Sequence, residues 1–119
     1  MAKLKDDLAA VDLCFTLVAE VADQLNLKTP AAREFLRYAL ANTLLMDRKQ
    51  QDYGPGNIAG FGTFGVVVRM NDKMERLKTL YNSGRKRRAV NESIQDTFRD
   101  ISNYGNIALM VDDSKWPKV

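Results

Sequence analysis

The chain has 119 residues and a mass of 13.4 kDa, the usual size of one domain, so we expect a single domain over residues 1–119. Its 45% hydrophobic and 28% charged residues are ordinary for a globular protein and exclude a disordered chain. The net charge of +3 is too small to indicate nucleic-acid binding by itself, and we do not expect a nucleic-acid partner.

The lack of histidine narrows the chemistry that the chain can perform. It excludes His-based zinc sites, Ser-His-Asp triads and Cys-His dyads within one chain. With a single cysteine, Cys14, an internal disulfide is also excluded. No stretch approaches ~20 apolar residues, so we expect no membrane span and a cytoplasmic location. A catalyst of this composition would use carboxylates, Lys, Arg, Tyr and a bound metal.

The first half of the chain predicts two helices. Apolar residues at alternating spacings of three and four predict a helix over about 5–26, with an apolar side wider than a surface helix needs. That width indicates a second neighbour, either inside the fold or in another subunit, and we expect a homo-oligomer. Thr29 and Pro30 are typical of an N-cap and a first helical position, and they begin a second helix that runs to about Gln50.

Residues 54–65 contain five of the seven glycines and predict a loop between the second and third helices. Two interpretations are open. The segment is a flexible connector, or it is a binding loop whose N–H groups face an anion together with the start of the following helix.

Two further helices follow, over about 63–81 and 91–111. The predicted buried side of the first consists of Val67, Met70, Met74, Leu77 and Tyr81, and that of the second of Val90, Ile94, Phe98, Ile101, Tyr104 and Ala108. Four helices joined by short connections predict an all-α fold, a four-helix bundle.

These two helices also carry charged sides. On the third, Arg69, Asp72 and Arg76 lie opposite the apolar stripe, with Lys73 beside them; on the fourth, Glu92, Asp96, Asp100 and Asn103 share a side. Two interpretations are open. The charged sides are solvated surfaces with ion pairs, or the two sides converge on one cleft. In a cleft, carboxylates would hold Mg²⁺, which prefers oxygen ligands, and the basic residues would hold phosphates.

The second half of the chain resembles the nucleotide modification associated domain 1 family. The resemblance lies in three ordered blocks, Asp52-Tyr53-Gly54, Val68 to Leu77 and Asn91 to Tyr104, which read DYG, RxxDKxxRL and ExxxDTxxDxxNY. It covers residues 52 to about 109. Members are common in phages and bacteria and are inferred to act on nucleotides, which implies a nucleotide or cyclic nucleotide ligand and, for a phage protein, the host cytoplasm.

The resemblance extends more distantly to the all-α NTP pyrophosphohydrolases, MazG-like and dimeric dUTPase-like enzymes, which hold Mg²⁺ with helical acidic pairs. Asp72 and Glu75 resemble the first pair, although it begins with Asp rather than Glu, and Asp96 with Asn103 resembles the end of the second. That second pair would need an acid at Ser93, whereas this chain has Glu92 and Asp100.

Charge pattern and resemblance together define the candidate site. The candidates are, as catalytic residues, Glu92, Asp96 and Asp100; as substrate-binding residues, Asp52, Tyr53, Gly54, Arg69, Lys73, Arg76 and Asn103; and as metal ligands, Asp72, Glu75, Glu92 and Asp96. Three functions stay open at this point: a Mg²⁺-dependent (d)NTP pyrophosphohydrolase, a non-catalytic binder that sequesters nucleotides or cyclic nucleotide defence signals, and a helical adaptor for another protein.

Overall fold

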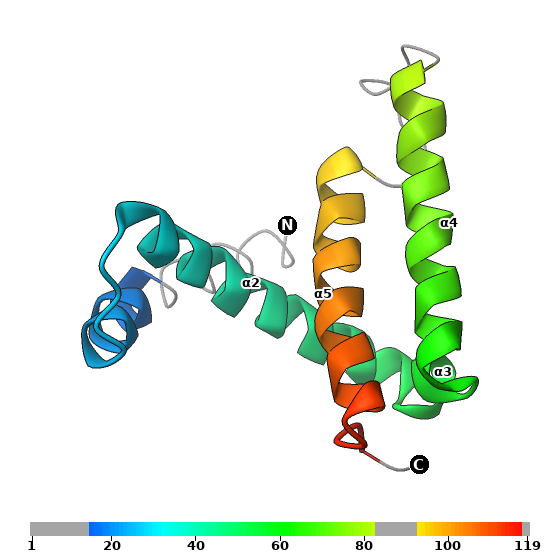
Figure 1. Cartoon of the computed structure of the whole chain (residues 1–119), viewed down its shortest axis with the longest axis horizontal. Helices are drawn as coiled ribbons and strands as arrows, with labels where there is room; N and C mark the ends of the chain where they lie inside the picture. The colour runs from blue at the N-terminus through cyan, green and yellow to red at the C-terminus, as the bar shows by residue number, and fades with distance from the viewer. Residues whose placement is uncertain (1–14, 83–92, 118–119) are drawn as a thin grey trace. The chain divides into compact units, whose positions relative to one another are not determined.

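The structure, a computed structural model, describes residues 15–82 and 93–117, and every regular element within these ranges is a helix (Figure 1). The described part of a first helix covers 15–24; it is followed by α2 (Pro30–Tyr53), α3 (Gly56–Ala59), α4 (Gly62–Asn82) and α5 (Ile94–Asp112). The predicted all-α class is confirmed. The glycine-rich segment differs in detail from the predicted loop, because it contains the short helix α3. Across the described residues, each helix is too short or too polar to cross a lipid bilayer.

The chain divides into two compact units, Met1–Arg48 and Lys49–Val119. In the first unit, the Arg37 guanidinium lies 4.8 Å from the centre of the Phe15 ring and so joins the first helix to α2. Thr29 accepts a hydrogen bond from the Ala32 N–H at 3.1 Å, which confirms it as the N-cap of α2. The expectation of one domain over residues 1–119 stays a prediction.

In the second unit, α4 and α5 lie side by side and run in opposite directions, and α3 packs against α4 (Figure 1). Gly54 (φ +73°) and Gly62 (φ +69°) have the left-handed backbone that glycine adopts without strain, and they bracket the turns around α3. Ser93 is the N-cap of α5, and the first helical residue, Ile94, lies three residues after the predicted start at about Asn91.

The buried side of α5 is polar, and this corrects the predicted apolar stripe. Its buried residues are Thr97, Asp100, Asn103 and Ile107, at spacings of three and four. Phe98, predicted to be buried, is 50% exposed, and Ile94, Ile101, Tyr104 and Ala108 are half-buried. The polar residues face inward because α4 and the end of α2 supply partners for them, as described below. Val90 lies outside the described residues.

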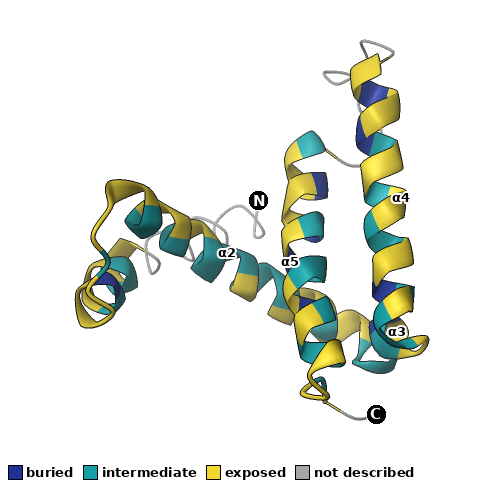
Figure 2. Cartoon of the chain, in the orientation of Figure 1, coloured by how far each residue is buried: buried dark blue, intermediate teal, exposed yellow. Residues whose placement is uncertain are grey.

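The buried side of α4 is also rotated from the predicted one (Figure 2). Val66, Leu77 and Leu80 are buried, and of the predicted stripe only Leu77 is among them. Val67, Met74 and Tyr81 are 44–50% exposed. Both predicted stripes were wrong for the same reason, since the contact between α4 and α5 is made by a mixed polar and apolar side of each helix.

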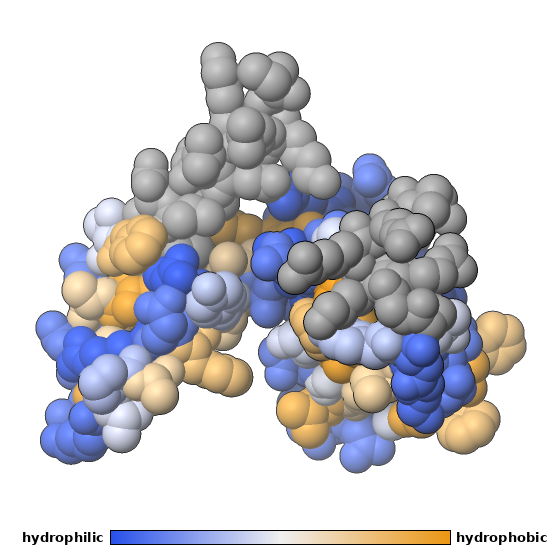
Figure 3. All heavy atoms as spheres, turned by 90° about the horizontal axis from the view of Figure 1, so that it is seen from above, coloured by the Kyte–Doolittle hydropathy of each residue, from blue (hydrophilic) through white to orange (hydrophobic). Residues whose placement is uncertain are grey.

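Large apolar side chains therefore remain at the surface of the described residues, among hydrophilic ones (Figure 3). The most exposed are Phe61 (88%), immediately before α4, and Phe64 (76%), in its first turn. Exposed aromatic groups of this kind are typical of contact surfaces when they form a contiguous patch. The homo-oligomer expected from the sequence stays a prediction.

Candidate functional site

Asp100 is a buried carboxylate at the contact between α4 and α5, and two lysines from different helices bind it. Its side chain is 8% exposed; Oδ1 lies 2.5 Å from Nζ of Lys49, and Oδ2 lies 3.0 Å from Nζ of Lys73. Lys49 belongs to the end of α2 and Lys73 to the middle of α4. Each oxygen of the carboxylate thus has its own ammonium group, which offsets the cost of burying the charge.

A second polar contact lies one turn away along both helices. Nη1 of Arg76 donates to Oγ1 of Thr97 at 2.8 Å, and the Thr97 hydroxyl donates to the backbone carbonyl of Ser93 at 3.1 Å. Thr97 is completely buried. Because Lys73 and Arg76 are three residues apart on α4, and Thr97 and Asp100 three apart on α5, the two contacts form successive rungs between antiparallel helices.

The two rungs bring three cationic side chains together, and we call Lys49, Lys73 and Arg76 the cationic cluster. Lys49 is at its edge, with 45% of its side chain exposed, whereas Lys73 is deeper at 20%. Asp100 holds both ammonium groups in place. Cations that are fixed before a ligand arrives bind an anion with little loss of side-chain entropy, so the arrangement is suited to a phosphate group.

Asp96 has a different role from Asp100, although the sequence places both on one side of the helix. It is the third residue of α5, where its N–H donates to the Ser93 hydroxyl at 3.0 Å. Its carboxylate is half exposed and forms an ion pair with Arg99 at 2.9 Å. Partial burial raises the pKa of the Asp96 carboxyl, but the hydrogen bond from Ser93 and the charge of Arg99 outweigh it, so that its pKa lies below its usual value. This is the geometry of a capping box.

We expect Asp96→Asn to lower the free energy of unfolding by about 1 kcal/mol at pH 7, since the cap loses its charge. The lowered pKa of Asp96 gives the sign of the pH dependence. Its ionised carboxylate stabilises the folded protein at pH values above the ordinary pKa of an aspartate, and this stabilisation is lost as the pH falls below about 4. Urea unfolding of both proteins at pH 7 and pH 3 measures this. Asp72→Asn, at an exposed position of α4, is the control and should change little. An equal loss at both pH values would contradict the capping role.

The other carboxylates named as metal ligands lie apart from one another. Glu75 is exposed on α4 and pairs with Lys78 at 3.2 Å, and Asp72 is exposed on the same helix. Glu92 lies outside the described residues. Within the described ranges no three acidic or cysteine side chains form a group that would hold a metal ion. Asp72, Glu75 and Asp96 therefore do not fit a common Mg²⁺ site, and magnesium stays a prediction for which these three give no geometry.

Of the remaining candidates, all except Asn103 lie in or contact the glycine-rich segment and the end of α2. Asp52 and Tyr53 are exposed at the end of α2, and Gly54 continues that helix by one hydrogen bond, from its N–H to the Gln50 carbonyl at 2.8 Å. Arg69 donates from Nη2 to the Asn57 carbonyl at 3.1 Å, which ties α4 to α3. Asn103 is buried on the side of α5 that carries Asp100. Their assignment to a substrate stays a prediction.

The structure thus brings together Lys73, Arg76 and Asp100 of the predicted set, and it adds two residues that the sequence did not single out. Thr97 was missed because a threonine between Asp96 and Phe98 gives no periodic signal of its own. A search for helical spacing that admits polar residues would have indicated this buried side of α5, which consists of Thr97, Asp100, Asn103 and Ile107. Lys49 stands in a polar run at the end of α2, and nothing in that run marks it.

The model of the family described as nucleotide modification associated domain 1 matches residues 49–111, just over half of the chain. The chain belongs to this family. The match begins at Lys49, where the second compact unit also begins, and it includes the cationic cluster, Thr97 and Asp100. Searches of curated proteins and of solved structures gave no match. The likeness to the all-α pyrophosphohydrolases stays a prediction.

Proposed function

We propose that this member of the nucleotide modification associated domain 1 family binds nucleotides through their phosphates at the cationic cluster. The observation that carries the proposal is that Lys49 and Lys73 meet at Asp100 while Arg76 contacts Thr97 one turn away along the same helix pair. Charge-assisted hydrogen bonds from ammonium and guanidinium groups to phosphate oxygens are among the strongest in proteins. The family description, which associates the domain with nucleotide modification, supports a nucleotide as the source of the phosphate.

The contacts favour binding over hydrolysis as the primary activity. A metal-dependent hydrolase needs carboxylates that are directed at one cation. Here Asp100 binds two lysines, Asp96 binds Arg99 and Glu75 binds Lys78, so each of these carboxylates has a cationic partner from the chain itself. A binder that sequesters a nucleotide or a cyclic nucleotide signal requires only the cluster.

Nucleotide binding is tested by thermal shift and calorimetry with a panel of nucleoside triphosphates, cyclic nucleotides and inorganic pyrophosphate, each with and without Mg²⁺. A ligand present at a hundred times its dissociation constant stabilises the folded state by about 2.7 kcal/mol, which raises the Tm by several degrees. Analysis of the ligand after denaturation separates the two activities: unchanged ligand supports a binder, whereas a monophosphate with released pyrophosphate would overturn binding without hydrolysis.

A pair of lysine substitutions tests the place of binding. Lys49→Met removes an ammonium group from the edge of the cluster, and Lys78→Met removes the same charge from an exposed position of α4, where Lys78 pairs with Glu75. We expect Lys49→Met to weaken pyrophosphate binding at least tenfold and Lys78→Met to leave it within twofold. Equal effects of both substitutions would show that only the overall charge matters and would overturn the site.

A further inference from the structure

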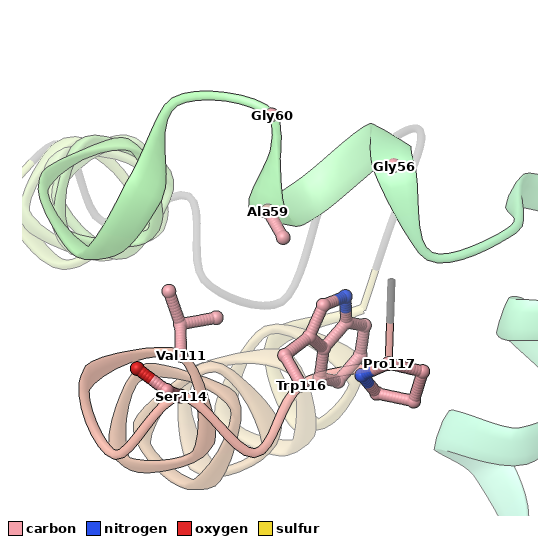
Figure 4. A pocket seen from close by; sticks show the side chains of 7 residues that line it. All are labelled: Gly56, Ala59, Gly60, Val111, Ser114, Trp116 and Pro117. Atoms are coloured by element: carbon pink, nitrogen blue, oxygen red, sulfur yellow. The ribbon is translucent and has the colours of Figure 1, made fainter. Parts of the chain in front are cut away.

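A pocket separate from the cationic cluster lies between α3 and the residues that follow α5. Its volume is about 320 Å³, within the range of small-molecule sites. It is lined by Gly56, Ala59, Gly60, Val111, Ser114, Trp116 and Pro117. Figure 4 shows the Ala59 methyl pointing from α3 toward the Trp116 ring, with Val111 at the end of α5 on the other side of the pocket.

The pocket exists because the chain turns sharply after α5. Ser114 has a left-handed backbone (φ 58°), and the N–H groups of Ser114 and Lys115 bond to the carbonyls of Val111 and Met110, which is a Schellman motif. The turn carries Trp116 back to the glycine-rich segment, where its Nε1–H donates to the Pro55 carbonyl at 2.9 Å. This bond fixes the orientation of the indole ring.

The opposite wall is open because it is made of small residues. A Cβ atom at Gly60 would lie 3.0 Å from the Gly56 carbonyl oxygen, closer than is usual, so a glycine is favoured there. Gly56 and Ala59 complete this wall and leave space in front of the indole. The fixed indole ring and these small residues line an open pocket that has room for a flat aromatic molecule.

The lining also indicates the charge of the occupant. None of the seven lining side chains is charged, and Ser114 supplies the only hydroxyl. A phosphate would lose its hydration in such a pocket without gaining a cationic partner. A neutral heteroaromatic ring would bury apolar surface against Val111 and Pro117 and stack on the indole, as bases do on aromatic side chains.

We propose that this pocket binds a nucleobase, stacked against Trp116. The proposal rests on the proposed function, since it assigns the base of the nucleotide ligand to a second place in the same unit. Asp100 and Val111 are about three turns of α5 apart, or roughly 16 Å along its axis. The two places are therefore separate, and free nucleosides and pyrophosphate are separate probes for them.

The experiment uses the fluorescence of Trp116, the single tryptophan of the chain. The intact protein is titrated with adenosine, guanosine, cytidine and thymidine, none of which carries a phosphate. We expect at least one nucleoside to quench the fluorescence saturably, because a stacked base deactivates the excited indole. No saturable quenching by any of them up to millimolar concentration would overturn the proposal.

Two substitutions locate the quenching. Ala59→Leu fills the pocket, and we expect it to weaken the binding of the quenching nucleoside at least tenfold; Ala31→Leu, at an exposed position of α2, should leave it unchanged. Equal affinity in both variants would overturn the proposal. Trp116→Phe retains a ring, and equilibrium dialysis should show that it binds the nucleoside within about tenfold of the wild type, whereas Trp116→Ala should bind it more weakly than Trp116→Phe.

The proposal for the pocket and the proposal for the cationic cluster can be overturned independently of each other. Pyrophosphate binding that depends on Lys49, without quenching by nucleosides, would overturn the nucleobase pocket and leave the proposed phosphate site standing. Quenching that Ala59→Leu abolishes, without any binding of pyrophosphate or triphosphates, would overturn the phosphate site and leave a nucleoside pocket.

Discussion

Replacing Asp100 by asparagine will lower the free energy of unfolding by about 2–4 kcal/mol, because it leaves the ammonium groups of Lys49 and Lys73 close together without the carboxylate between them. Breaking a buried ion pair by removing one partner is among the most destabilising single changes in proteins. Asparagine has nearly the same shape, so the loss reports on charge rather than on packing. Urea unfolding at pH 7 measures it.

The control is Asp96→Asn, which removes a carboxylate from the same helix at a half-exposed position. It should cost about 1 kcal/mol, well below the loss at position 100. Equal, small losses for the two variants would contradict the buried pairing of Asp100 with the lysines.

The same variant also bears on the proposed phosphate site. Without the carboxylate, the cationic cluster carries one more net positive charge, so an anion should take over part of the role of Asp100. We expect pyrophosphate to raise the Tm of Asp100→Asn by more degrees than that of the wild type, when chloride of equal ionic strength serves as the reference. An increase no larger than that of the wild type would indicate that the cluster is only a structural ion-pair network.

The helices themselves could be predicted from the sequence with some precision, because their ends are marked by local chemistry. Thr29 and Pro30 were expected to begin the second helix, and α2 begins at Pro30 with Thr29 as its N-cap. Caps and glycines act within one turn of the chain, so a local pattern contains the information needed to place them. The start of α5 was placed about three residues too early, at Asn91 instead of Ile94, since asparagine and serine are both favourable N-cap residues.

The rotation of α4 and α5 about their axes could not be predicted in this way. A count of apolar spacings favours the side with Phe98 over the side with Thr97 and Asp100, because it assigns every carboxylate to solvent. One of the partners that offset the cost of burying the Asp100 carboxylate is Lys49, which lies 51 residues earlier in the chain. No pattern within a single helix reports a contact at that separation. The pattern placed Lys73 and Arg76 away from the packing side of the helix, whereas in the structure both contact α5, on the side where Leu77 is buried.

A comparison of Ile107→Ala with Leu109→Ala tests which side of α5 is the packed one. Ile107 is 4% exposed and Leu109 is 63% exposed, although both are aliphatic residues near the end of the same helix. Ile107→Ala should lower the free energy of unfolding by about 2–4 kcal/mol, since it removes buried methyl groups and leaves a cavity beside α4. Leu109→Ala should cost less than about 1 kcal/mol, because its side chain is already largely in water.

Urea unfolding of the two alanine variants, each followed by far-UV circular dichroism, measures these losses. The two substitutions make comparable changes in helix propensity, so a difference between them reports on burial. Equal losses in the free energy of unfolding would indicate that Leu109 is buried in a contact outside the single chain. Light scattering would then detect a dimer by its doubled mass. A larger loss for Leu109→Ala would restore the apolar stripe that the sequence predicts and would remove the polar rungs from the interior. In that case Lys73 and Arg76 would no longer be positioned by Asp100 and Thr97, and the phosphate site would lose its structural basis together with the packing.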